Sequence, residues 1–176
     1  MKVFRFLHLV RPANIYKSSF LKAVAEFQTE SRDLDIDGQA LERDFSSYVS
    51  RVRGWAFGKN LLPGYVPESV YWLVDGKRYI GKVSVRHRLI PHLRKIGGHI
   101  GYEIRPSQRR RGYGTMILRL ALLKARQLGI KRALVTCDET NIGSRKIIEA
   151  NGGILENAVA MGRGQPKKLR FWIKNY

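Results

Sequence analysis

The segment 99–137 is the part of this 176-residue chain that most constrains its fold. It begins with His99-Ile-Gly-Tyr-Glu-Ile-Arg105, which reads as a strand, and Pro106 stops that strand because proline cannot donate to a sheet. Residues 112–128 are apolar at most positions of their first half, which predicts a helix buried against a sheet and capped by Gly129. Residues 132–137 read as the next strand. This order of strand, helix and strand predicts an α/β (α+β) protein.

The rest of the chain supplies further elements of the same kind. The spacing of apolar residues changes from about four to two after residue 67, where helices give way to strands. We expect helices over 15–30, 40–58 and 141–151, and strands over 3–10, 69–74, 78–86, 154–161 and 169–174. Together these predict one domain over 1–176, with a mixed, mostly antiparallel twisted sheet of about six or seven strands and about four helices on both faces.

Charge is the most unusual feature of the composition. The net charge is +19, with 33 Lys and Arg against 14 Asp and Glu. Such an excess indicates a polyanionic partner, either nucleic acid or a phosphorylated ligand, or else only a solvated basic surface. The basic residues are scattered through periodic segments rather than gathered in a tail, which argues against a disordered nucleic-acid arm.

Other classes of protein are disfavoured. There is no apolar run of 18 residues, so we expect no membrane-spanning helix and no membrane partner. Cys137 is the only cysteine, which excludes an internal disulfide and fits a reducing cytoplasm. The four histidines lack metal-ligand spacing, so we predict no metal.

A basic, glycine-bearing turn precedes the buried helix. Arg109, Arg110 and Arg111 are followed by Gly112 and Gly114. The first N–H groups of a helix are unpaired and carry partial positive charge, so such a turn is suited to holding a phosphate group. The sequence is neither the G-x-G-x-x-G dinucleotide fingerprint nor a Walker P-loop.

Two motifs resemble those of a known family. Arg109-Arg-Arg-Gly-Tyr-Gly114 fits the Q/R-x-x-G-x-G/A turn of the GNAT superfamily of acetyl-CoA-dependent N-acetyltransferases. The segment from Asn141 to Gly152 resembles the second signature of that superfamily. The resemblance covers about residues 69–160, and the run 66–157 also looks like a subgroup of bacterial predicted acetyltransferases.

The resemblance implies a sheet splayed at its centre and a binding site for acetyl-CoA. This cosubstrate is expected between the strands at 99–105 and 132–137, with its pantetheine arm paired to backbone near Glu103, Ile104 and Arg105. The Asn141 side chain is expected to bond the same arm. The diphosphate is expected on the backbone N–H groups of residues 109–115, namely Arg109, Arg110, Arg111, Gly112, Tyr113, Gly114 and Thr115.

Acetyl transfer also needs groups that polarise the thioester and take the proton of the amine. We expect the Ile104 N–H to polarise the thioester carbonyl. Glu103 is the first candidate for the base, the alternative being a strand glutamate that faces solvent or pairs with an arginine. His99 is a weaker candidate. Asp138 and Glu139 either act through water or form a turn and cap a helix.

The leaving group is where the sequence departs from the family pattern. Many members carry a tyrosine seven residues after the Asn, but that position here is Ile148, which has no proton to donate. Ser144 either hydrogen-bonds the departing thiolate or is a small residue that allows close packing. Cys137 reads as a small buried residue, not a covalent nucleophile, so transfer is expected to be direct.

The acceptor is expected to be a small-molecule or peptide amine. We expect its site to include the basic segment 88–98, so Arg88, Arg94 and Lys95 suggest an anionic acceptor. A nucleic-acid-binding module is the less favoured alternative, and an acyl-CoA-binding sensor without turnover is a third. The C-terminal hairpin of such folds can serve in dimers, so a homodimer is also considered.

Overall fold

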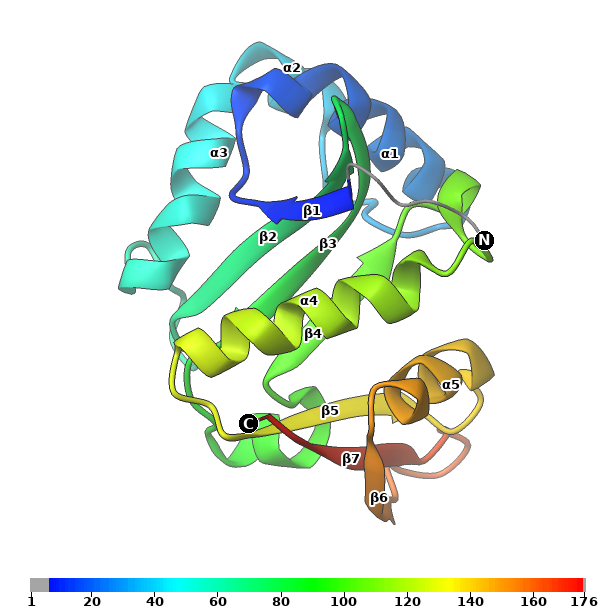
Figure 1. The fold of residues 1–176 in the computed structure, drawn as a ribbon. Coiled ribbons are helices and arrows are strands. Elements are labelled where there is room, and N and C mark those ends of the chain that lie inside the picture. The colour runs from blue at the N-terminus through cyan, green and yellow to red at the C-terminus, as the bar shows by residue number, and fades with distance from the viewer. Residues whose placement is uncertain (1–6, 176) are drawn as a thin grey trace.

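Two sheets organise residues 7–175, the part of the chain that the computed structural model describes (Figure 1). All strand pairs within each sheet are antiparallel. The first sheet has the order β1-β2-β3-β4, formed by Leu7–Val10, Glu68–Asp75, Arg78–Arg86 and Ile100–Ile104. The second has the order β5-β7-β6, formed by Arg132–Asp138, Lys168–Lys174 and Ile154–Val159. These seven strands confirm the predicted fold class.

The two sheets are joined at the start of β4. The His99 N–H donates to the Leu134 carbonyl at 2.7 Å, and the Leu134 N–H donates to Nδ1 of His99 at 2.9 Å. Gly98 allows this approach, because it has φ of 65° and a Cβ there would lie 2.5 Å from the Leu134 oxygen. Beyond this bridge, β4 and β5 form no ladder. The sheet is therefore splayed at its centre, as predicted.

Helices cover both faces of the first sheet (Figure 1). Helices α1 (Lys17–Thr29), α2 (Gly38–Arg43) and α3 (Phe45–Gly54) enclose an aromatic core in which Phe20 stacks on Trp72, with ring centroids 4.7 Å apart. Helix α4 (Tyr113–Gln127) buries Ile117, Leu118 and Ala121 in a second core on the opposite face. Helix α5 (Ile142–Ala150) packs beside α4 and β5. The sheet thus lies between two apolar cores, which fixes the position of β4.

Most predicted elements occur within a few residues of their expected bounds, with two exceptions. The single helix expected over 40–58 is wrong: the backbone breaks at Asp44, with φ of −130° and ψ of 57°, and the Asp44 side chain accepts the Ser47 N–H to begin α3. The segment 88–98, expected as a loop, contains a π-helical turn, Leu93–Gly97. Residues 3–6 of the first expected strand lie outside the described residues, whereas residues 7–10 form β1.

No helix formed by residues 7–175 has both the length and the apolar character needed to cross a membrane.

His99 is neutral in the folded protein because of its place in the bridge. Burial, followed by the charges of Arg94 and Arg86, lowers the pKa of His99 to about 4. The unfolded chain has a histidine pKa of about 6.5, so it binds a proton between pH 6.5 and 4 that the folded chain does not. The contribution of neutral His99 to the free energy of unfolding is therefore fully present above pH 6.5, and it is lost as the pH falls toward 4.

His99→Asn tests this pH dependence, because the Asn side-chain oxygen can accept the Leu134 N–H but does not titrate. The free energy of unfolding of the wild type should fall more steeply below pH 6.5 than that of the variant, by up to about 1.4 kcal/mol per pH unit. Urea unfolding of both proteins between pH 7.5 and 4.5 measures the difference. Parallel curves would mean that His99 takes up its proton in the folded protein at the same pH as in the unfolded chain.

Candidate active site

A cleft of about 900 Å³ lies where β4 and β5 separate. Its lining combines the end of β4, the turn before α4 and the first turn of α5, with Glu30 and Arg32 from the end of α1 and the residues after it. The predicted site residues in this lining are Glu103, Ile104, Arg109, Arg110, Gly112, Tyr113, Gly114, Thr115, Asn141 and Ser144. Arg105 and Arg111 are absent from it. The fold therefore brings together most residues that the sequence predicts, from segments about 40 positions apart.

The start of α4 offers unpaired backbone donors to this cleft. Gly112 precedes the helix with φ of 85°, and no side chain caps it. Within the described residues, the N–H groups of Gly112, Gly114 and Thr115 have no acceptor, and Met116 makes the first bond, to the Gly112 carbonyl. These donors and the helix dipole form a site for an anion such as a diphosphate. The residues present thus fit the diphosphate of CoA.

Position 114 is glycine for a structural reason that the sequence did not reveal. A Cβ at this position would lie 2.4 Å from Cδ1 of Ile147 on α5. The Asn151 side chain also ties the two helices together, donating to the carbonyls of Thr115 at 3.2 Å and Ile147 at 2.8 Å. Gly114 therefore lets the starts of α4 and α5 converge on one cleft.

Arg105 must be withdrawn from the predicted contacts with the pantetheine arm. Its guanidinium turns away from the cleft and binds Glu26, with Nε 2.8 Å from the carboxylate. Its backbone N–H donates to Ile80 on β3, and its carbonyl accepts from Gln108. Burial would raise the pKa of Glu26, but the hydrogen bonds from Arg105 and Ser107 outweigh it and lower that pKa. Arg105 therefore anchors the end of β4 to α1.

Arg109 also has a mainly structural set of partners. Its two terminal nitrogens donate to the two oxygens of the Glu30 carboxylate at 2.7 and 2.8 Å, and its Nε donates to the Ile104 carbonyl at 3.1 Å. Arg110 and Arg111 are exposed beside the same turn. Arg109 therefore fixes the turn against the end of α1, and Arg110 and Arg111 are the arginines with no such partner among the described residues.

The backbone of Ile104 faces the gap between the sheets. In an antiparallel pair, alternate residues of a strand direct both backbone groups to the same neighbour. Arg105 bonds to β3, and the register of β3 and β4 places Ile104 between the bonded positions. Its carbonyl accepts from Arg109 instead. The Ile104 N–H therefore points toward the cleft, where it can polarise a carbonyl oxygen.

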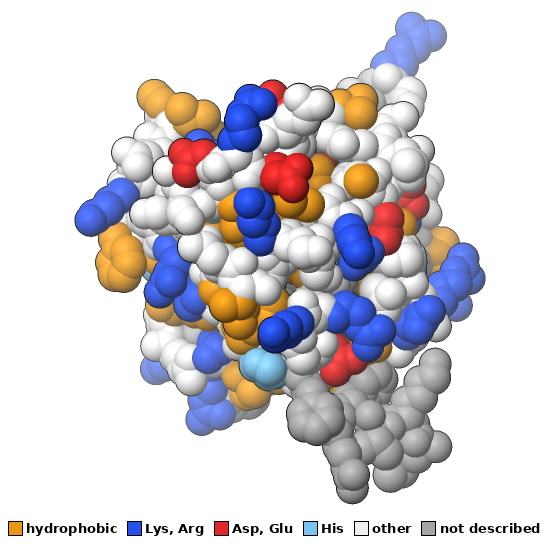
Figure 2. All heavy atoms as spheres, turned by 90° about the horizontal axis from the view of Figure 1, so that it is seen from above, with side chains coloured by type: hydrophobic (Ala, Val, Ile, Leu, Met, Phe, Trp, Pro, Cys, Tyr) orange, Lys and Arg blue, Asp and Glu red, His pale blue; other side chains and the backbone are white. Residues whose placement is uncertain are grey.

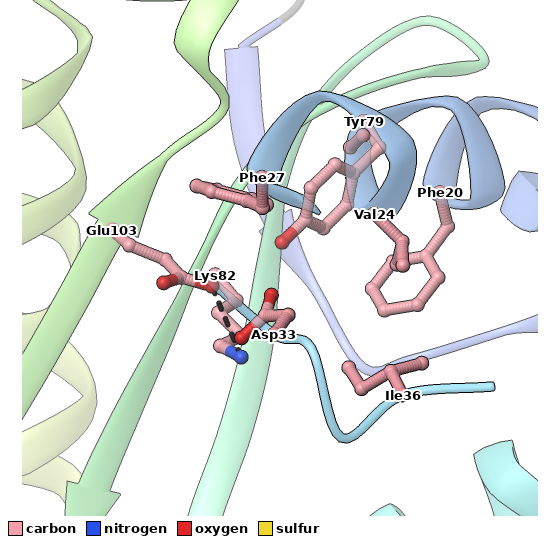
Figure 3. A pocket seen from close by; sticks show the side chains of 9 residues that line it. Phe20, Val24, Phe27, Asp33, Ile36, Tyr79, Lys82 and Glu103 are labelled. Atoms are coloured by element: carbon pink, nitrogen blue, oxygen red, sulfur yellow. Dashed lines mark ion pairs between the residues drawn. The ribbon is translucent and has the colours of Figure 1, made fainter. Parts of the chain in front are cut away.

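Glu103 is held between two cations, Arg32 and Lys82, of which Figure 3 shows Lys82. Its carboxylate lies 2.5 Å from Arg32 and 3.0 Å from Lys82, and its side chain is 13% exposed. Burial would lower the pKa of Lys82, but Glu103 outweighs it and raises that pKa, so Lys82 stays charged. An adjoining cavity of about 10 Å³, room for about one water molecule, is walled by Phe20, Val24 and Phe27. Glu103 thus pairs with an arginine, and it also lines the cleft, where a base is expected.

The first turn of α5 carries the second signature. The Asn141 side-chain oxygen accepts the Ser144 N–H at 2.9 Å and caps the helix, which leaves only its NH₂ group for a ligand. The Ser144 hydroxyl lies 2.9 Å from the hydroxyl of Tyr102 on β4. Ile148 is fully buried in the core. Cys137 is buried too, and burial raises the pKa of its thiol, which disfavours a thiolate nucleophile.

The remaining candidates lie elsewhere. His99 belongs to the bridge between the sheets, and Asp138 pairs with Lys168 while Glu139 accepts the Lys167 N–H at the end of β5. Arg88, Arg94 and Lys95 do not line the cleft, because their segment packs against β5, where the Thr136 hydroxyl donates to the Ile96 carbonyl at 2.7 Å. The expectation that segment 88–98 flanks the acceptor at Glu103 is therefore wrong.

Sequence reasoning missed three side chains of the site: Tyr102 and Arg32, which line the cleft, and Lys82, which pairs with Glu103 beside the adjoining cavity. Tyr102 reads as an ordinary strand aromatic, and Arg32 and Lys82 lie far from Glu103 in sequence. The alternation of side chains along β4 places Tyr102 on the same face as Ile104 and could have pointed to it. Nothing in the sequence around Arg32 or Lys82 indicates that either one pairs with Glu103. In residues 7–175, no group of three or more His, Cys, Asp or Glu could hold a metal ion.

Solved structures share this fold at low sequence identity. A microcin C7 self-immunity acetyltransferase, MccE, in complex with acetyl-CoA and AMP superposes with a TM-score of 0.68 at 15% identity, covering 97% of this chain and 93% of that one. An acetyltransferase from Salmonella typhimurium that modifies the N-terminal serine of ribosomal protein L7/L12 gives 0.64 at 17%, covering 96% and 94%.

A spermidine N-acetyltransferase chimera of Vibrio cholerae SpeG and hSSAT gives a TM-score of 0.63 at 14% identity, covering 96% of this chain and 95% of that one. No curated protein sequence matches the chain. The family model described as an acetyltransferase (GNAT) domain matches residues 32–154, which is more than half of the chain. The chain therefore belongs to the GNAT acetyltransferase family, and it is an acyltransferase whose acetyl donor is acetyl-CoA.

Proposed function

We propose that the protein transfers the acetyl group of acetyl-CoA directly to a primary amine. The observation that carries this proposal is the convergence, on one cleft, of the uncapped start of α4 and the open edge of β4. The first provides donors for a diphosphate, and the second provides the Ile104 N–H for a thioester carbonyl. Acetyl-CoA supplies an electrophilic carbonyl carbon and a thiolate leaving group.

Different residues of the cleft bind different parts of acetyl-CoA. The N–H groups from Arg110 to Thr115 hold the diphosphate, and Arg110 and Arg111 add positive charge beside them. Arg109 keeps the turn in place through Glu30. The NH₂ group of Asn141 and the Ile104 backbone bind the pantetheine arm. Direct transfer is favoured because the buried Cys137 has a raised pKa.

Glu103 is the proposed proton acceptor for the amine. It lines the same cleft as the next residue, Ile104, whose N–H is proposed to hold the acetyl carbonyl. A general base must lie within hydrogen-bond reach of the amine proton, directly or through one water. Its carboxylate is held in place by Arg32 and Lys82. Proton transfer to Glu103 is direct or passes through one water molecule.

The acceptor approaches from the side formed by Glu30, Arg32 and Glu103, since segment 88–98 lies away from the cleft. The similar structures described above include enzymes named for a protein N-terminus and for spermidine. Both acceptors are primary amines, and we propose the same chemical class here. The proposal does not require the acceptor to be anionic, because the arginines that suggested it lie elsewhere.

A nucleic-acid-binding module is less well supported. Lys and Arg side chains are scattered among acidic and apolar ones on the face that Figure 2 shows, rather than gathered into a stripe that could follow a phosphate backbone. A module of that kind also needs no uncapped helix start within a cleft.

One experiment separates transfer from the other two possibilities. Thermal unfolding is measured with and without acetyl-CoA, and CoA release is then followed over a panel of peptide N-termini, polyamines and small amines. A shift in melting temperature with turnover supports the enzyme, and a shift without turnover supports a sensor. Absence of a shift, with salt-dependent binding of nucleic acid, would support the alternative module.

Arg110→Ala combined with Arg111→Ala tests the diphosphate site. We expect about a tenfold loss of affinity for acetyl-CoA but unchanged affinity for acetyl-pantetheine, which lacks the diphosphate. Isothermal calorimetry with both ligands measures this. Arg119→Ala with Arg126→Ala, which removes two exposed arginines from the body of α4, is the matched control. An equal loss with both ligands would show that these arginines act on something other than the diphosphate.

Glu103→Gln tests the proposed base. The rate constant kcat should fall about a hundredfold, while the affinity for acetyl-CoA changes little, because the amide cannot accept the proton. Release of the CoA thiol against pH provides the measurement. Glu149→Gln is the control, since that carboxylate pairs with Arg145 on the exposed side of α5. A variant with undiminished kcat would remove Glu103 from this role.

A further inference from the structure

The departing sulfur needs a hydrogen-bond donor that position 148 does not supply. Ile148 is fully buried and has no polar hydrogen. Helix α5 therefore contributes a single hydroxyl to the cleft from its first turn, that of Ser144. A second hydroxyl reaches the same point from the opposite wall, because Tyr102 of β4 also lines the cleft.

Tyr102 and Ser144 form a pair across the gap between the two sheets. Their hydroxyl oxygens lie 2.9 Å apart, and the Tyr102 hydroxyl also lies 3.4 Å from the Ser144 carbonyl. The Tyr102 ring packs against the apolar core, and the Ser144 backbone is fixed by its bond to Asn141. Both hydroxyls are thus held by rigid elements, one on each side of the cleft.

The chemistry of two hydroxyls decides which one faces the ligand. Each has one hydrogen, so a mutual bond leaves one hydrogen for a third group. In the structure the Tyr102 hydroxyl donates to the Ser144 carbonyl at 3.4 Å, a long and weak bond that an anionic ligand in the cleft would replace. A phenol is a stronger acid than an alcohol and makes a stronger hydrogen bond to an anion. The favoured arrangement has Ser144 donating to the Tyr102 oxygen and Tyr102 donating into the cleft. The positive end of the α5 dipole adds to the stabilisation of negative charge there.

We propose that Tyr102 donates the hydrogen bond that stabilises the departing CoA thiolate, and that Ser144 positions it. This inference rests on the acetyl transfer proposed above. The carbon–sulfur bond breaks with both electrons going to sulfur, which accepts the Tyr102 hydrogen bond. The amine nitrogen forms its bond to the acetyl carbon and loses its extra proton to Glu103. Glu103 then releases that proton to water, and water supplies the proton that the thiolate takes up as CoA leaves. Tyr102 keeps its own proton throughout.

Burial is consistent with a donor that does not ionise. It raises the pKa of Tyr102 to about 12, against the opposing effect of the bond from Ser144. A thiol has a pKa of about 8.5, so its thiolate is too weak a base to deprotonate this phenol. Tyr102 therefore stays protonated near neutral pH and can donate a hydrogen bond. Its role is to stabilise the negative charge on sulfur rather than to transfer its proton.

The ionisation of bound CoA tests Tyr102 without any turnover. Thiolate absorbance of the CoA complex is titrated against pH, with the desulfo-CoA complex as the blank that subtracts Cys137 and the tyrosines. The thiol of CoA bound to the wild type should have a pKa about one to two units lower than in Tyr102→Phe, a change of about 10- to 100-fold in the ionisation constant. Ser144→Ala should give a smaller change in the same direction.

Kinetics with matched variants supply the second readout. Tyr102→Phe should lower kcat about a hundredfold with little change in the affinity for acetyl-CoA. Tyr71→Phe, which removes a phenol hydroxyl from β2 outside the cleft lining, should leave kcat unchanged. A role limited to holding α5 against β4 predicts instead lower stability and weaker CoA binding, with no change in the thiol pKa.

The outcomes separate this inference from the function on which it rests. Tight CoA binding with the same thiol pKa in the wild type and in Tyr102→Phe would overturn the role of Tyr102 and leave acetyl transfer intact. Failure of the wild type to bind CoA at all would overturn both.

Discussion

The separation of β4 from β5 is the constraint on which the site depends. One pair of hydrogen bonds between His99 and Leu134 holds the sheets together, and Gly98 makes that approach possible. Past this point the strands have no common ladder, so the backbone of β4 keeps an edge without a strand partner. An unpaired edge inside a protein is costly unless a ligand, water or side chain satisfies it. The cleft is therefore a place where backbone groups are available for binding.

Two helix starts converge on that edge, and they differ in how they are capped. Helix α4 begins at a left-handed glycine with no side-chain cap, whereas α5 is capped by Asn141, whose oxygen is thereby used. The contact between Gly114 and Ile147 sets how closely the two starts approach. The diphosphate binding and thiolate stabilisation proposed above would both use the positive ends of two helices that lie side by side.

Much of the basic charge around the cleft serves the fold. Arg105 and Arg109 tie β4 and the turn before α4 to Glu26 of α1 and to Glu30 just after it, and Arg32 reaches Glu103. These ion pairs cross from one part of the chain to another and hold the acceptor side of the cleft. A run of arginines in a sequence therefore has two roles here, and only the unpaired members, Arg110 and Arg111, are available to a ligand.

The sequence by itself determined the order of strands and helices, the glycine turn before α4 and the signature at Asn141, because periodicity, caps and turns are local properties of the chain. It did not determine the break at Asp44, the partners of Glu103 or the pairing of Tyr102 with Ser144. Each of the pairings joins residues 21 to 71 positions apart, and strand register and the packing of the elements decide which of them meet, as where Lys82 lies opposite Glu103 in the β3–β4 ladder. Local pattern specifies which groups a chain offers, whereas packing in three dimensions decides which of those groups remain free to bind.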